Sequence, residues 1–149
     1  MELASRCAFG FTACIVLLSA TGCTNTEAVQ EQASTIKPLA VLYGKYVGEH
    51  RGQPPASEAE FKAYVEASGK PILEANKISD VNSLFTSSRD HQPYVILYGP
   101  LKGPPGPAGQ PVFAYEKVGV NGKRYVASSL GAVEEVDEAR FKELVPGAP

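Results

Sequence analysis

The 149-residue sequence contains no tryptophan and a single methionine, and none of its three cysteines lies beyond position 23. The chain after Cys23 therefore has no thiol that would form a disulfide or a thiolate metal site. The 14 basic and 16 acidic side chains of the whole sequence nearly balance, for a net charge of -2. Without an excess of positive charge, the sequence does not predict binding to nucleic acids.

An uncharged stretch runs from Cys7 to Cys23, which is short for a membrane-spanning helix, since such a helix needs about 20 apolar residues. The stretch fits the hydrophobic region of a secretory signal, because Arg6 and the amino terminus supply the positive charge that precedes such a region. Glu2 partly offsets that charge. We therefore expect an exported protein whose first segment is a signal peptide.

The same stretch ends in Ala20-Thr21-Gly22-Cys23, which resembles a bacterial lipobox, although Ala20 stands where leucine is usual. In a lipobox, small residues fit the signal peptidase and the cysteine thiol accepts diacylglycerol. The resemblance implies cleavage between Gly22 and Cys23 and a lipid anchor on Cys23. Two or three acyl chains hold a protein on a membrane stably, because each buried methylene contributes about 0.8 kcal/mol.

A second interpretation concerns the same segment. Gly10-Phe11 resembles the processing site of type IV prepilins, which are cut between glycine and phenylalanine. Prepilins carry a glutamate five residues into the mature chain, where this sequence has Ile15, and polar residues resume here at Thr24 instead of a long apolar helix. These departures favour the lipobox, and prepilin processing stays an alternative.

Composition divides the chain into three parts. We expect residues 1–22 to be the signal peptide, residues 23–34 the lipidated cysteine with a flexible polar tether, and residues 35–149 one domain. Apolar residues at helical spacing predict helices over about 38–47 and 57–69 in that domain.

Side-chain caps and strand signals predict the remaining elements. Ser57, Asp80 and Asp137 are expected to cap helices, the last of them a short helix at the end of the chain. Asn121-Gly122 predicts a type I′ hairpin turn, because both positions of that turn need a positive φ. The segments expected to form strands are 94–98, 112–118, 124–130 and 133–136. The predicted fold is therefore α+β, with helices packed on one face of a small three- to four-stranded antiparallel sheet.

A segment rich in proline and glycine, from Gly99 to Pro111, lies between the first two predicted strands. Three of its triplets follow the collagen register, but a triple helix needs three chains and many more repeats. We interpret the segment as a long hairpin loop, extended and stiffened toward polyproline II. A partner that binds proline-rich segments is an alternative role for it.

Several short motifs resemble the heads of type II secretion pseudopilins, a group of pilin-like proteins. They are an aromatic helix followed by a Gly-x-x-Pro turn within residues 39–64, Gln92-Pro93-Tyr94-Val95, and a strand over 123–131 that ends in Ser-Leu-Gly. The resemblance covers about residues 36–136 and implies an antiparallel sheet packed on a helix. It does not extend to pilus assembly, because the long polymerisation helix is missing. The calcium-binding aspartates of some pseudopilins have no match, so we expect no metal.

Arg89-Asp90-His91 is the densest titratable cluster, and a histidine beside a carboxylate suits acid–base chemistry. No motif ties a serine or cysteine nucleophile to these residues. We interpret the cluster as a solvated turn in which Asp90 bonds the backbone, and we expect no enzyme activity and no cofactor. An envelope hydrolase that uses His91 is the alternative.

Seven tyrosines give the domain most of its aromatic character. Such residues form either an exposed surface for a glycan or peptide, or the margin of the core with a wet hydroxyl. The candidate interaction surface comprises the four in or beside predicted strands, which are Tyr94, Tyr98, Tyr115 and Tyr125.

These observations predict a membrane-anchored bacterial envelope lipoprotein with a non-catalytic structural or protein-interaction role. Its expected partners are the membrane, through the lipid on Cys23, and other envelope proteins. By resemblance to the sorting rule of two-membrane bacteria, Thr24 after the lipidated cysteine favours the outer membrane where the host has one. The alternative function is a pseudopilin-like component of a secretion or pilus-type assembly.

Overall fold

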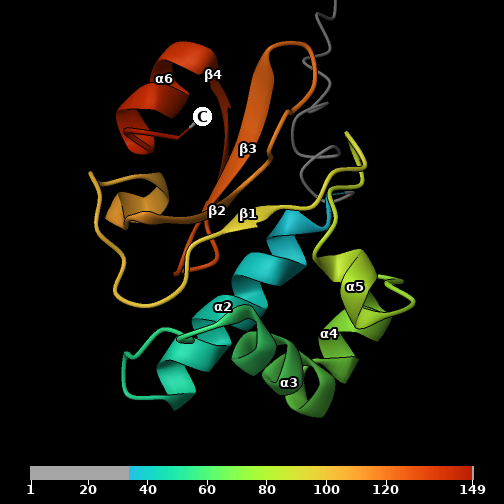
Figure 1. The fold of residues 1–149 in the computed structure, drawn as a ribbon. Coiled ribbons are helices and arrows are strands. Elements are labelled where there is room, and N and C mark those ends of the chain that lie inside the picture. Colours follow the sequence, from blue (N-terminus) through green and yellow to red (C-terminus); the bar gives the residue numbers. More distant parts are fainter. Residues whose placement is uncertain (1–33, 149) are drawn as a thin grey trace, which may run out of the picture.

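The computed structural model describes residues 34–148 and has the predicted α+β fold (Figure 1). A four-stranded antiparallel sheet has the strand order β1-β2-β3-β4, so each strand pairs with the next one along the chain. Within residues 34–148, no helix has the length and hydropathy needed to cross a membrane. The elements are α2 (Ile36–Glu49), α3 (Glu58–Ser68), α4 (Lys70–Ala75), α5 (Val81–Leu84), β1 (Val95–Ile96), η1 (Pro107–Gly109), β2 (Val112–Tyr115), β3 (Lys123–Ser128), β4 (Val133–Asp137) and α6 (Glu138–Leu144).

The predicted caps and the hairpin turn are confirmed. The side chains of Ser57, Asp80 and Asp137 each accept a hydrogen bond from the backbone N–H three residues later, at the starts of α3, α5 and α6. Asn121 and Gly122 have φ values of 54° and 74°, as a type I′ turn requires. Interactions between residues close in sequence therefore fix where these helices begin and where the chain turns from β2 into β3.

The sheet is covered on both faces, which corrects the expectation that all helices pack on one face. The larger cluster joins α2, α3 and the sheet, and Tyr43 stacks on Phe113 with ring centroids 3.9 Å apart. The smaller cluster lies on the other face, where Phe141 and Leu144 of α6 pack against Val126. Figure 1 shows α6 and the helices α2–α5 on opposite sides of the sheet. Adjacent residues of β3 point to opposite faces, so both clusters draw on the same strand.

Strands β1 and β2 are shorter than predicted because the residues next to them form hydrogen bonds with groups outside the sheet. The N–H of Tyr94 donates to the carbonyl of Phe85 at 3.0 Å, so β1 pairs with β2 only from Val95. Beyond β2, the carboxylate of Asp90 accepts the N–H groups of Val118 and Gly119. A side chain from a distant loop therefore ends the ladder that a strand over 112–118 would have continued.

The proline-rich loop joins β1 and β2 as a hairpin connection, as predicted, but it is not extended throughout. Gly106 donates its N–H to the carbonyl of Gln110 at 2.8 Å across the short helix η1. Ala108 and Gly109 have φ values of 53° and 72°, which reverse the chain. A Cβ on Gly106 would lie 3.7 Å from Leu144, so the reversed part packs beside α6.

Candidate functional site

The predicted lipidation and cleavage residues, Cys23 and Gly22, lie outside the described residues. The candidate sites below all belong to the domain that would follow the tether.

The four tyrosines chosen as a candidate interaction surface are mostly buried. Tyr94, Tyr115 and Tyr125 are only 7%, 5% and 3% exposed, and Tyr98 is half-buried. The phenol of Tyr94 lies 2.9 Å from the hydroxyl of Thr35, inside the domain. Because both faces of the sheet are covered, these side chains contribute to the two cores, and the expectation of an exposed surface made from them is corrected.

A buried ionic cluster, which the sequence did not reveal, lies at the end of β2. We define the Glu116 cluster as Ser87, Arg89, Glu116, Tyr125 and Glu135. The carboxylate of Glu116 is fully buried and accepts hydrogen bonds from the Ser87 hydroxyl and the Tyr125 N–H, each at 2.9 Å. Burial raises the pKa of Glu116, and these two hydrogen bonds and Arg89 oppose that rise.

Arg89 supplies the positive charge of the cluster. Its Nε lies 3.7 Å from the Glu116 carboxylate, and its Nη1 lies 2.8 Å from Glu135 on β4. Its guanidinium also lies over the ring of Tyr125, 4.1 Å from the centroid, in a cation–π contact. The cluster therefore joins the loop before β1 to β3 and β4. Ser87 and Glu116 are closed to solvent, so the cluster has a structural role and does not form an exposed catalytic pair.

The backbone engages the carboxylate of Asp90, the residue that precedes His91. The Asp90 carboxylate accepts three backbone N–H groups, those of Gln92, Val118 and Gly119. Burial favours a higher pKa, but these hydrogen bonds outweigh it and leave the pKa of Asp90 lowered. His91 is exposed beside Asp90 and has a φ of 56°. The interpretation of Asp90 as a backbone-bonding turn residue is confirmed. Arg89, which was expected to be solvated in the same turn, has a side chain only 15% exposed, and this part of the expectation is corrected.

His91 lines an open polar pocket of about 540 Å³ together with several hydroxyl side chains. Those hydroxyls are engaged within the protein. Thr35 donates to the Thr86 carbonyl at 2.6 Å, and Ser83 donates to Asp80 at 2.7 Å. Among the described residues, no group of three or more histidine, cysteine or acidic side chains is placed to hold a metal ion.

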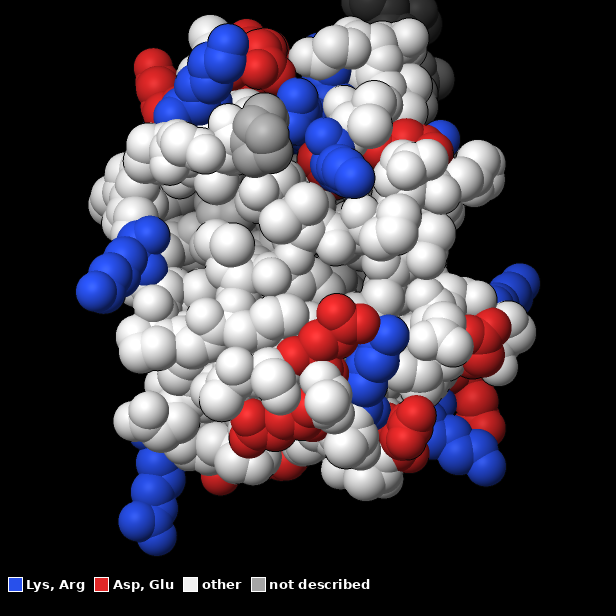
Figure 2. Space-filling view, in the orientation of Figure 1, with Lys and Arg blue, Asp and Glu red and all other residues white. Residues whose placement is uncertain are grey.

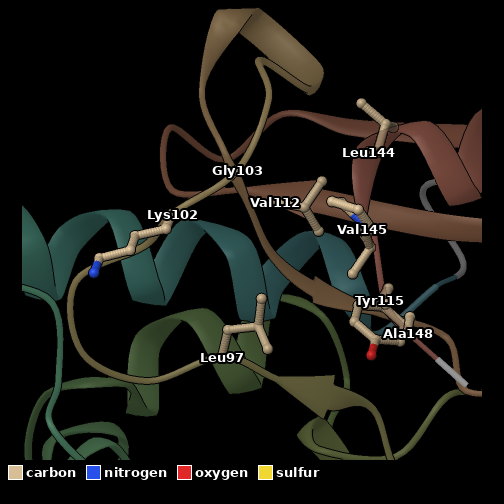
Figure 3. Close-up of a pocket in the computed structure, with 10 residues that line it drawn as sticks. Leu97, Lys102, Gly103, Val112, Tyr115, Leu144, Val145 and Ala148 are labelled. Atoms are coloured by element: carbon tan, nitrogen blue, oxygen red, sulfur yellow. The ribbon is translucent and has the colours of Figure 1, made fainter.

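A broad, largely uncharged face covers the side of the molecule where β1, η1 and the proline-rich loop lie (Figures 1 and 2). The proline-rich loop runs between two pockets on this side. The first, the C-terminal pocket, holds about 280 Å³ between the loop, β2 and the residues after α6. In Figure 3, Val112, Val145 and Tyr115 lie close together in this pocket, whereas Lys102 points away from them.

The second pocket, which we call the proline pocket, holds about 390 Å³. It lies between the end of α2, the loop after it, both ends of the proline-rich loop and the turn after β3. All ten described residues that line it are uncharged. Among them are Tyr43, Val47, Gln53, Leu101, Gln110 and Ser129.

Two exposed apolar side chains lie next to this pocket. Leu130, which follows the pocket residue Ser129, is 67% exposed, and Val41 on α2 is 42% exposed. A Cβ on Gly131 would lie 3.7 Å from the side chain of Val41, so the turn after β3 lies against α2. Val41 and Leu130 are thus exposed apolar side chains on two segments that lie against each other.

No protein-family model, no curated protein and no solved structure matches this chain.

Proposed function

We propose that this protein is a membrane-anchored bacterial envelope lipoprotein whose domain binds other envelope proteins without catalysis. The lipobox-like sequence that ends in Cys23 supports the anchor. The exposed apolar side chains of Val41 and Leu130, near the uncharged proline pocket, carry the interaction role. A contact surface of this kind suits a protein that the lipid already holds at a membrane, because tethering raises the local concentration of partners there.

The anchor is tested by labelling cells with radioactive palmitate. The wild-type chain and Cys14→Ala, a matched control in the same uncharged stretch, are expected to incorporate label. Cys23→Ala is expected to incorporate none, because the acceptor of diacylglycerol is gone. Equal labelling of Cys23→Ala and the wild type would refute the proposed anchor.

The interaction role is tested by site-specific photo-cross-linking in cells. A photoreactive residue at position 130 is expected to form a defined adduct with an envelope protein. The same residue at position 70 is the control, because Lys70 is well exposed on α4, where it pairs with Glu74 of the same helix. Adducts that are absent at position 130, or identical at both positions, would contradict a partner surface at Leu130.

A pseudopilin-like component of an assembly is the second candidate, and the packing of α2 against an antiparallel sheet favours it. Sequencing of the mature amino terminus separates the two functions. A free terminus at Phe11 would support the pseudopilin-like role, and a blocked terminus at Cys23 would support the lipoprotein.

A further inference from the structure

Strand β4 forms one edge of the sheet and pairs only with β3. The ladder between them begins where the N–H of Ser128 donates to the carbonyl of Ala132 at 2.9 Å. Hydrogen-bonded and non-hydrogen-bonded positions alternate along an antiparallel pair, so the even-numbered residues of β4 bond to β3. Val133 and Glu135 therefore direct their backbone N–H and carbonyl groups away from the sheet.

These outward groups are available to another strand. Those of Val133 and Glu135 bond to no other residue between 34 and 148. The opposite edge of the sheet differs, because β1 has only two residues and the N–H of Tyr94 beside it already donates to the carbonyl of Phe85 at 3.0 Å. An open edge strand is a template for pairing with a further strand. Between the two edges, β4 is the one that is able to extend the sheet.

The side chains of β4 indicate what an added strand would carry. The strand has two adjacent glutamates and no basic residue. Glu135 is paired within the protein, since Nη1 of Arg89 lies 2.8 Å and Nζ of Lys123 lies 3.6 Å from its carboxylate. The side chain of Glu134 is 42% exposed, and its ion pair with Nε of Arg140 is 4.0 Å long. A basic side chain on a neighbouring strand would therefore find a carboxylate in Glu134.

Exposed apolar side chains lie where the chain enters β4. Leu130 is 67% exposed in the turn that leads into the strand. Val41 of α2 is 42% exposed and lies beside Gly131 of the same turn. The open edge is therefore continuous with the two side chains that carry the proposed interaction role.

A second copy of the chain fits this edge poorly. An antiparallel pair of β4 strands that uses both Val133 and Glu135 sets either Glu134 or Glu135 opposite its own counterpart, and like charges in that position are destabilising. We propose that β4 accepts an extended segment of a partner envelope protein as an added strand, which bonds to Val133 and Glu135 through its backbone and places a basic side chain beside Glu134. This inference rests on the proposed function and specifies how the domain would bind its partner.

The first test measures hydrogen exchange at single amides of the full chain, isotope-labelled and held in detergent micelles. In the free protein, the amides of Val133 and Glu135 should exchange fast, while those of Glu134 and Val136 are protected by their bonds to β3. The probe is acetyl-Thr-Val-Lys-Val-Thr-Val-amide, an extended peptide with one positive charge. At about ten times its Kd, the peptide should slow exchange at Val133 and Glu135 about tenfold.

A matched pair of variants isolates the backbone contact. Val133→Pro removes the outward N–H, and an edge strand tolerates proline where its nitrogen faces away from the ladder. We expect this variant to bind the peptide at least about tenfold more weakly, since one strand bond is lost and the ring obstructs the edge. Val133→Thr keeps the N–H and the side-chain shape and should bind like the wild type. Unchanged protection at Glu134 and Val136 shows that each variant is folded.

The charge is tested on the probe. The peptide with glutamate in place of its lysine should bind about fivefold more weakly, because it loses the attraction to Glu134 and adds a like charge. Equal binding of the two peptides, wild-type affinity in Val133→Pro, or no added protection at Val133 and Glu135 would overturn the proposal.

Photo-cross-linking from position 130 in cells separates this inference from the proposed function. The adduct should be lost in Val133→Pro and kept in Val133→Thr. An adduct that persists in Val133→Pro would overturn the added strand and leave the interaction role standing. An adduct with twice the mass of the chain would identify a second copy and overturn the proposed partner. The absence of any adduct in the wild type would overturn the proposed function, and this inference with it.

Discussion

Replacing Arg89 with methionine removes the guanidinium that faces both Glu116 and Glu135, while the new side chain keeps much of the volume of the arginine stem. Glu116 then remains fully buried without its cation. Removing one partner of a buried ion pair costs about 3–5 kcal/mol of unfolding free energy. Because 3.7 Å separates Nε from the Glu116 carboxylate, we expect the lower end, about 3 kcal/mol.

The loss caused by Arg89→Met depends on pH in a defined direction. Burial already raises the pKa of Glu116, and removal of the guanidinium raises it further, so this carboxyl takes up its proton more readily in the variant. A raised folded pKa means that the contribution of Glu116 to stability is largest in acid and falls as pH rises through that pKa. The destabilisation should therefore be smaller at pH 4 than at pH 7.

Urea unfolding of the full chain at both pH values, followed by circular dichroism, measures this effect. The control is Lys70→Met, which removes an exposed pair with Glu74 at 3.8 Å and should change stability by less than about 0.5 kcal/mol. The reasoning is refuted when Arg89→Met unfolds within about 0.5 kcal/mol of the wild type at pH 7. An equal loss at pH 4 and pH 7 would refute only the expectation that Glu116 takes up a proton between these pH values.

Three further predictions concern other contacts. Asp90→Asn should lose about 1–2 kcal/mol at pH 7, because the carboxylate of Asp90 accepts three backbone N–H groups. Since the folded pKa of Asp90 is lowered, urea melts should show the variant and the wild type converging as pH falls below the ordinary pKa of aspartate and on through the folded pKa. Phe141→Ala should cost about 3–5 kcal/mol in the same assay, because the ring is buried and packs on Tyr115 with centroids 5.1 Å apart; a loss below 1 kcal/mol would contradict this packing. Gly119→Ala should lower the melting temperature, because φ is 77° and a Cβ would lie 2.2 Å from the carbonyl oxygen of Lys123; an unchanged temperature would show that the turn is built differently.

The sequence predicts the features that depend on neighbouring residues. Ser57, Asp80 and Asp137 are each followed within three residues by the N–H that they cap, so the signal and its partner lie in one window of sequence. Asn121-Gly122 specifies its turn in the same way. These local signals were sufficient to predict the α+β class and the antiparallel order of the strands.

The sequence does not predict the features that join distant segments. The Glu116 cluster brings together three separate places in the chain, around residues 87–89, 116 and 125–135. The residues around Arg89 have the polar composition of an exposed turn. None of them indicates that two carboxylates lie close to its guanidinium in the folded protein. The burial of Tyr115 depends on α6 lying on the second face of the sheet, which amphipathic spacing alone does not determine.

Intact mass spectrometry of the protein purified from membranes tests most directly whether Cys23 carries the proposed lipid. We predict a chain that begins at Cys23 and carries the added mass of a diacylglyceryl group, with or without a further acyl chain. A water-soluble chain of unmodified mass, a chain that retains residues 1–22, or one that begins at Phe11 would contradict it.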